Sequence, residues 1–300
     1  MRVLLTGARG MLAAAVQRDL ASTGAEVVAF DRAGLDITDG ETVTARVAAT
    51  RPDVIVNCVA YNDVDGAESD AVTALRVNAI GVRHLASAAR TVDATLVHYS
   101  TDFVFDGVAD RPYTEDDAPN PRSVYGSSKL LGEWFALDHG RSYVLRVESL
   151  FGEPGSGGRG HGSLKAIVTR IRSGETTPVF VDRTVSPGYT TDVAAATRAL
   201  IVAGAPYGIY HCVNTGPTTW AAIADEAARL LGIPVRTSPI TLAGLALPAK
   251  RPVYSALSNA KLAAAAFPMP TWQDALARHI ERSRQCNERQ SSSRGHSPST

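Results

Sequence analysis

The sequence RVLLTGARGMLAAAVQRDLAST, residues 2–23, joins an apolar run to a helical pattern through a short turn that contains two glycines. We expect a buried strand over residues 2–7 and a helix over residues 11–23. Gly7 and Gly10 allow a tight turn and a close approach of the backbone to a pyrophosphate, which the N–H groups at the helix start would bind. The alternative interpretation is a plain strand–helix turn.

The same alternation of apolar runs and helical patterns continues along the first half of the chain. Further strands are expected at 26–31, 53–60, 95–102 and 142–149, and helices at 41–50, 68–92 and 125–138. The strand runs are continuously apolar, which is typical of a sheet covered on both faces. This pattern predicts an α/β fold with a doubly wound parallel sheet of the Rossmann type.

The pattern changes after Gly152. The glycine-rich stretch 153–162 is either a linker or a lid over a ligand. Helices at 163–174, 190–204 and 219–232 and strands at 178–183 and 208–214 follow. We predict a dinucleotide-binding domain (1–150 plus about 185–215), a smaller substrate-binding domain (151–184 and 216–283) and a disordered tail (284–300).

The composition excludes several classes of protein. Thirty basic and 30 acidic residues give a formal net charge of zero, so electrostatics provide no case for binding nucleic acid or an anionic membrane. No signal peptide and no membrane span is recognisable, and we expect a cytoplasmic protein. The three cysteines lack metal-ligand spacing, and no acidic cluster indicates a metal, so we expect none.

Tyr125 and Lys129 stand four residues apart in VYGSSKLLGE, residues 124–133. On a helix they share one face. A lysine ammonium beside the phenol would lower the tyrosine pKa toward neutrality, where the phenol can exchange a proton with a substrate. The alternative is an exposed polar pair.

Polar residues at the ends of two strands complete the pattern. Thr101 and Asp102 end the fourth strand, where ligands bind in open parallel sheets, and Thr101 could share a substrate oxygen with Tyr125. Asp31 ends the second strand, where an acid accepts ribose hydroxyls of a dinucleotide, whereas Arg32 beside it could hold a 2′-phosphate. NADH and NADPH therefore both stay open as cofactors.

Asp36 and Ile37, in LDITD, could flank the adenine of such a dinucleotide. Asp36 could equally be only a helix cap.

Five stretches resemble one known group of proteins. They are GxxGxxA at 7–13, NCVAYNDVDGAE at 57–68, HYSTDFVFDG at 98–107, YGSSKLLGE at 125–133 and SPGYTTDVA at 186–194. Together they resemble the extended short-chain dehydrogenase/reductase superfamily and, within it, the dTDP-4-dehydrorhamnose reductase family of sugar-nucleotide 4-ketoreductases. The resemblance extends from residue 1 to about residue 282. It implies an NAD(P)-binding Rossmann fold, NADPH or NADH as cofactor and a nucleotide-sugar substrate, and it is compatible with a homodimer.

The resemblance also implies roles for individual residues. Thr101, Tyr125 and Lys129 match the family's catalytic threonine, tyrosine and lysine. The positions that match cofactor contacts are Gly10, Met11 and Leu12 at the pyrophosphate, Asp31, Asp36 and Ile37 near the ribose and adenine, Val59, Ala60 and Tyr61 after the third strand, and Tyr99 beneath the nicotinamide. Thr101 and Asp102 match substrate contacts, and residues 251–262 resemble the stretch near the nucleotide-sugar. Arg251, with Lys250 and Arg183 as alternatives, is our candidate for binding the sugar-nucleotide pyrophosphate.

The chain departs from the family pattern at two residues and in the long glycine-rich loop 153–162. Ala13 replaces the third glycine, which the fold tolerates. RVESLFG places Ser149, with Glu148 beside it, where the family carries an aromatic residue that packs on the sugar, so Ser149 is our candidate substrate contact and the sugar identity stays open. A sugar-nucleotide C4 epimerase and a non-catalytic cofactor-binding regulatory subunit are the competing interpretations, whereas a dehydratase would carry Glu in place of Phe103.

Overall fold

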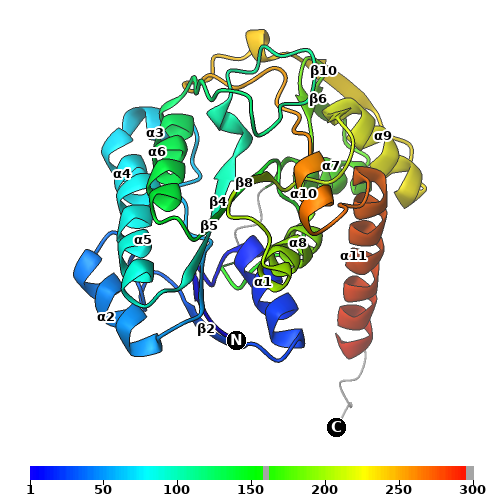
Figure 1. Cartoon of the computed structure of the whole chain (residues 1–300). Coiled ribbons are helices and arrows are strands. Elements are labelled where there is room, and N and C mark those ends of the chain that lie inside the picture. The colour runs from blue at the N-terminus through cyan, green and yellow to red at the C-terminus, as the bar shows by residue number, and fades with distance from the viewer. Residues whose placement is uncertain (158–161, 295–300) are drawn as a thin grey trace.

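The computed structural model describes residues 1–157 and 162–294. Six parallel strands form the central sheet, in the order β2, β1, β3, β4, β5, β8 (Figure 1). Their bounds are β1 Arg2–Thr6, β2 Glu26–Phe30, β3 Val54–Asn57, β4 Thr95–Thr101, β5 Ser142–Val147 and β8 Gly208–His211. The strand order reverses beside β1, which pairs with both β2 and β3. Such a reversal creates a ligand-binding crevice at the carboxyl ends of the strands.

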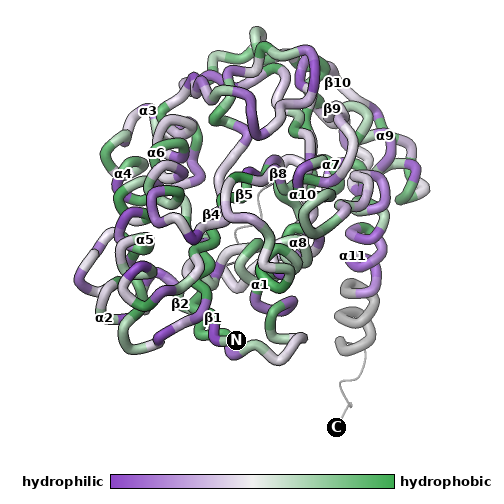
Figure 2. The backbone as a smooth tube through the Cα atoms, in the orientation of Figure 1, coloured by the Kyte–Doolittle hydropathy of each residue, from purple (hydrophilic) through white to green (hydrophobic). Residues whose placement is uncertain are grey.

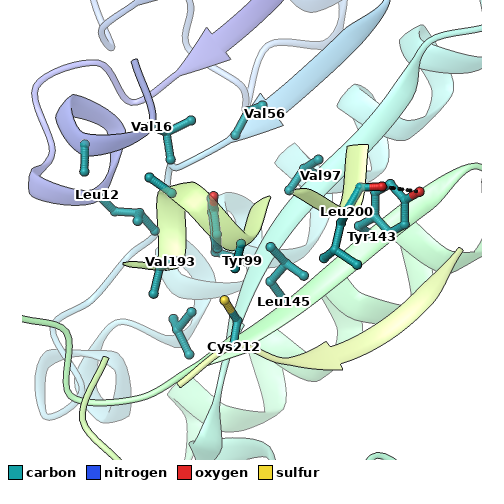
Figure 3. Packing of buried hydrophobic residues seen from close by; sticks show 14 of the residues in the cluster. Leu12, Val16, Val56, Val97, Tyr99, Tyr143, Leu145, Val193, Leu200 and Cys212 are labelled. Carbon is teal, nitrogen blue, oxygen red and sulfur yellow. Dashed lines mark hydrogen bonds between the residues drawn. The ribbon is translucent and has the colours of Figure 1, made fainter. Parts of the chain in front are cut away.

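Helices cover both faces of this sheet. On one face lie α2 Gly40–Thr50, α3 Gly66–Ser69, α4 Ala71–Leu75, α5 Gly81–Thr91 and α6 Val124–Asp138, and on the other lie α1 Met11–Ser22 and α8 Thr190–Ala203 (Figure 1). Figure 3 shows α1 and α8 residues packed against Val56, Val97 and Leu145 of the strands. Neighbouring strand residues such as Leu4 and Ile55 bury into the opposite cluster. The expected α/β fold is confirmed. Its strands are continuously apolar because both of their faces are buried.

A second hydrophobic core lies beside the sheet. It draws on α7 Ser163–Arg172, α9 Trp220–Leu231 and α11 Trp272–Arg294. Short strands pair around it: β6 Thr177–Phe180 with β10 Thr237–Ile240, and β7 Thr184–Val185 with β9 Thr218–Thr219. The remaining elements are α10 Ala260–Ala265, the π-helix η1 Arg76–Ile80, and the 3-10 helices η2 Asp102–Val104 and η3 Leu242–Gly244. The division into two domains at the expected boundaries stays a prediction.

One expectation about helices needs correction. The helix expected over 68–92 is divided into α4, η1 and α5, with the short α3 ahead of them. Helix α11 continues through residues 284–294, and the disordered tail expected over 284–300 stays a prediction. No glycine or proline interrupts the chain between α11's packed start and Gly295, so nothing breaks the helix there. Residues 295–300 lie outside the described residues.

Figure 2 shows hydrophobic runs along the strands in the middle of the molecule and a hydrophilic stretch along α11. Within residues 1–157 and 162–294, no helix is both long enough and apolar enough to cross a bilayer. The same residues contain no group of three or more His, Cys, Asp or Glu placed to hold a metal ion.

Candidate active site

The turn between β1 and α1 has the shape of an anion-binding loop. Gly7 has a φ of +74°, and a Cβ added to it would lie 2.9 Å from the carbonyl carbon of Cys58 and 3.0 Å from the nitrogen of Val59. Gly10 precedes α1, and no side chain caps the start of that helix. The uncapped N–H groups of Met11 and Leu12 and the helix dipole therefore suit a pyrophosphate.

Gly7→Ala is expected to weaken dinucleotide binding by about tenfold or more, since left-handed strain of ~1–2 kcal/mol adds to a clash with backbone that cannot move aside. Gly24→Ala is the matched control, because Gly24 also has positive φ, +80°, but a Cβ there would meet nothing within 4 Å. Isothermal titration with NADPH and thermal melts of both variants measure the effect. Equal losses in the two variants would show that crowding at Gly7 has no role.

The glycine-rich segment after Gly152 lies against this loop. The Gly157 N–H donates to the Arg9 carbonyl at 3.1 Å. A Cβ on Gly155 would overlap the carbonyls of Arg9 and Gly10. Residues 158–161, which belong to the stretch interpreted as a linker or lid, lie outside the described residues.

The acid after β2 makes a local turn. Asp31 Oδ1 accepts from the N–H groups of Ala33 and Gly34, both at 3.1 Å. Arg32 is exposed and pairs with Asp36 at 3.3 Å. Asp31 and Arg32 thus both lie at the surface beside the glycine loop, consistent with either cofactor.

The structure corrects the helix-cap alternative for Asp36, near the expected adenine position. Asp36 does not cap a helix, because it accepts from Thr38 N–H and hydroxyl, and Asp39 caps α2 instead. The side chain of Ile37 is 1% exposed and lies against Gly81 in the core, and the expected place of Ile37 near the adenine stays a prediction.

Tyr125 and Lys129 lie on the inner face of α6, and both are buried. The helix starts at this point because Ser123 caps it, its hydroxyl accepting from the Gly126 N–H at 3.1 Å. The absence of a side chain at Gly126 lets α6 approach the Phe103 carbonyl, which an added Cβ would overlap. Tyr125 consequently packs edge-on against Phe103, with ring centroids 5.5 Å apart.

The expected lowering of the Tyr125 pKa by Lys129 is wrong in this structure. Burial raises the pKa of Tyr125 to about 12, although the Thr101 hydroxyl partly offsets the rise. The Lys129 ammonium donates instead to the Tyr99 carbonyl at 2.5 Å. Burial lowers the pKa of Lys129 to about 8, against the opposing effect of Glu133. Tyr125 is therefore protonated at neutral pH, as a general acid must be.

Thr101 and Asp102 meet Tyr125 where β4 ends. The Thr101 hydroxyl donates to Asp102 Oδ1 at 3.0 Å and accepts from the Phe103 N–H at 3.2 Å. Tyr99, two residues earlier, directs its hydroxyl toward Thr197 on α8, 2.7 Å away. The Tyr99 backbone therefore faces Lys129 while its side chain points to α8, and the expected place of Tyr99 beneath the nicotinamide stays a prediction.

Two asparagines that sequence reasoning missed position the segment after β3. Asn57 Oδ1 accepts from the Thr6 hydroxyl at 2.8 Å and from the Val59 N–H at 3.0 Å. Asn78 binds both backbone groups of Tyr61, at 2.8 and 3.1 Å, and donates to the hydroxyl of Ser128. Ala60 lies between these two fixed points and is partly exposed, as are Val59 and Tyr61. No spacing rule finds Asn78, because the π-helix that directs it inward appears only in the folded chain.

Beneath Lys129 lies a buried ion pair. Glu133 accepts from Arg146 at 2.9 and 2.7 Å, and both side chains are 1% exposed. The Ser100 hydroxyl also donates to Glu133. Because Glu133 stands one turn beyond Lys129 on the same face of α6, it favours the charged lysine.

The predicted substrate residues are spread more widely. Arg251 makes a bidentate pair with Asp65 at 3.0 and 2.6 Å, so its guanidinium is already partly neutralised. Lys250 is exposed and Arg183 is half-buried. Ser149 has a φ of +44° and lines a small, mainly apolar pocket of the second core with Trp220 and other residues.

The arrangement can be compared with known proteins. The family model described as the RmlD substrate binding domain matches residues 1–285. The chain belongs to the dTDP-4-dehydrorhamnose reductase family. One relative in that family, the dTDP-4-dehydrorhamnose reductase of Streptomyces griseus, is 44% identical over 284 residues, covering 92% of this chain and 91% of its own length.

Two further comparisons fit this family. A protein of Streptomyces antibioticus named probable dTDP-4,6-dihydroxy-2-methyloxan-3-one 4-ketoreductase is 38% identical over 282 residues, covering 92% of this chain and 93% of its own. The structure of dTDP-4-dehydrorhamnose reductase from Bacillus anthracis in complex with NADP has a TM-score of 0.87 at 33% identity, covering 94% of this chain and 99% of that one. The resemblance stated from the sequence motifs is confirmed.

Proposed function

We propose that this protein is an NAD(P)H-dependent reductase of the 4-keto group of a nucleotide-activated deoxysugar. The observation that carries the proposal is the meeting of Thr101, Tyr125 and Lys129, all buried, at the carboxyl edge of the sheet. The names of the relatives at 44% and 38% identity point to the same chemistry.

The residues around the glycine loop fit a nicotinamide dinucleotide. The crowded Gly7 and the uncapped start of α1 suit its pyrophosphate. We assign the ribose hydroxyls to Asp31 and Lys129, with Arg32 placed for a 2′-phosphate. When bound in reduced form, the dinucleotide supplies the hydride that C4 of the sugar accepts.

The chain's own residues manage the proton and the charge. Tyr125, held protonated by burial, donates its proton to the C4 oxygen as negative charge develops there. Thr101 binds the same oxygen and fixes its position. Lys129, anchored on the Tyr99 carbonyl, keeps a positive charge beside the reacting groups.

A panel assay tests the proposal. Purified protein is offered NADPH and NADH with dTDP-, GDP- and UDP-linked 4-keto-6-deoxy sugars, and oxidation is followed by absorbance. Turnover with one sugar supports the proposal, and the C4 configuration of the product identifies the reaction. Failure with every sugar despite cofactor binding would favour the regulatory-subunit interpretation.

The homodimer stays a prediction, which light scattering on the same preparation can test.

A further inference from the structure

Two buried carboxyl groups lie behind the proposed general acid, and the mechanism above leaves them without a role. Asp102 follows β4 and is 3% exposed, and Glu148 follows β5 and is 2% exposed. Ser255 lies beside both: its hydroxyl donates to Glu148 Oε1 at 2.5 Å, and it partly offsets the rise in the pKa of Asp102. Glu148 Oε2 accepts from the Ser186 N–H at 2.6 Å. Among the described residues, the buried Asp102 Oδ2 finds no hydrogen-bond partner.

The charges around this carboxyl pair do not balance if both groups are ionised. Arg183 is the cation that lowers the pKa of both carboxyl groups. The charges of Arg251 and Asp182 in turn affect the pKa of Arg183. The phenols of Tyr125 and Tyr254 are the other titratable groups affected by the pair. Two carboxylates facing one guanidinium in a buried site favour retention of one proton.

The pKa values of Asp102 and Glu148 agree with the retention of one proton by the pair. Burial raises the pKa of Asp102 to about 6, and burial together with the Asp102 charge raises the pKa of Glu148 well above its ordinary value. The pair as a whole therefore holds two protons in acid, one across the neutral range and none in alkali.

A series of hydroxyl and carboxyl groups leads from the pair to the general acid. The Thr101 hydroxyl donates to Asp102 Oδ1 at 3.0 Å, and the same hydroxyl partly offsets the rise in the Tyr125 pKa, which places it beside the phenol. The order is Glu148, Ser255, Asp102, Thr101, Tyr125. Each intervening group is a hydroxyl or a carboxyl, which can accept a proton on one side and release one on the other.

We propose that Asp102 and Glu148 share a proton that restores Tyr125 after each reduction. The inference rests on the proposed function. Tyr125 gives its proton to the C4 oxygen, Thr101 passes its hydroxyl proton to the phenolate, and Asp102 passes a proton to Thr101. Glu148 resupplies Asp102 through Ser255, and solvent reloads the pair between turnovers, so each reduction consumes one proton. Both carboxyls act through Tyr125 and are therefore positioning residues.

The first test is the pH dependence of Glu148→Gln. Glutamine keeps the shape and one acceptor oxygen but cannot hold the shared proton. The variant then depends on Asp102 alone, which loses its proton as the pH rises past about 6. We expect kcat near wild type at pH 5.5 and at least ~10-fold below it at pH 8, with KM unchanged. Ser255→Ala, which breaks the link but keeps both carboxyls, should move the profile in the same direction.

The control is Asp192→Asn, a buried carboxyl that binds Asn214 and Arg278 away from this chain of groups. It should leave the pH profile of kcat unchanged. If Glu148→Gln lowered kcat by the same factor at every pH, Glu148 would only hold Ser186 and Ser255 in place, and the proposal would be overturned.

A second readout needs no turnover. Infrared difference spectra between wild type and Glu148→Gln should show the carbonyl stretch of a protonated carboxyl at pH 7 in the wild type only. Absence of that band in the wild type overturns the shared proton. Turnover of the wild type in the same preparation separates the proposed function from the proton relay. A wild type that reduces no 4-keto sugar overturns the proposed function, and the relay with it. An active wild type whose pH profile of kcat superimposes on that of Glu148→Gln overturns the relay alone.

Discussion

Tyr125→Phe is expected to lower kcat by at least ~100-fold, the usual contribution of a general acid, while cofactor affinity stays unchanged. The substitution removes only the hydroxyl, so the edge-on packing of the ring against Phe103 survives. Burial keeps the phenol protonated at neutral pH and leaves the side chain 9% exposed, so water has little access to replace it as the proton donor. Stopped-flow cofactor oxidation measures the rate, and titration calorimetry measures the affinity.

Tyr143→Phe is the matched control for this variant. Its buried hydroxyl, on β5, donates to the carbonyls of Leu200 and Ala205 and lies on the α8 face of the sheet (Figure 3). Loss of that hydroxyl should reduce stability without changing kcat. Near-wild-type turnover in Tyr125→Phe would show that another group protonates the substrate.

Arg146→Met is expected to lower the free energy of unfolding by ~3–5 kcal/mol, because it leaves the Glu133 carboxylate buried without its partner. Both side chains are 1% exposed. The guanidinium also lies over the Phe105 ring, 4.9 Å from its centroid, so methionine retains only part of the packing. Urea denaturation of wild type and variant measures the difference.

The double variant Arg146→Met/Glu133→Met separates stability from function. Replacing a whole buried ion pair by apolar residues is often neutral for stability, so most of the lost stability should return. Activity should not return with it, because Lys129 loses the carboxylate that opposes the effect of burial on its pKa. A single Arg146→Met variant as stable as wild type would contradict this account of the pair.

Local patterns predicted the parts of the molecule that depend on local physics. The apolar runs and the turn at Gly7 predicted β1, α1 and the parallel sheet. Strand burial and the steric demands of a tight turn both depend on residues that are adjacent in the sequence. The spacing of Tyr125 and Lys129 predicted a shared helix face, which α6 provides.

The features that were missed depend on long-range contacts or on burial. Lys129 binds the Tyr99 carbonyl 30 residues away, so its distance from the tyrosine along the helix did not determine its partner. Arg251 pairs with Asp65 across 186 residues of sequence. The direction of the Tyr125 pKa reversed because desolvation, which no spacing reveals, raises the pKa and outweighs the opposing effect of the Thr101 hydroxyl.

The most direct test of the central claim is isotope transfer. The protein is incubated with a 4-keto-6-deoxy nucleotide-sugar and NADPH or NADH that carries deuterium at the transferable position. We predict one deuterium on C4 of the product for each cofactor oxidised. A sugar inverted at C4 without net cofactor oxidation, or a cofactor bound but never oxidised by any sugar offered, would contradict the reductase account.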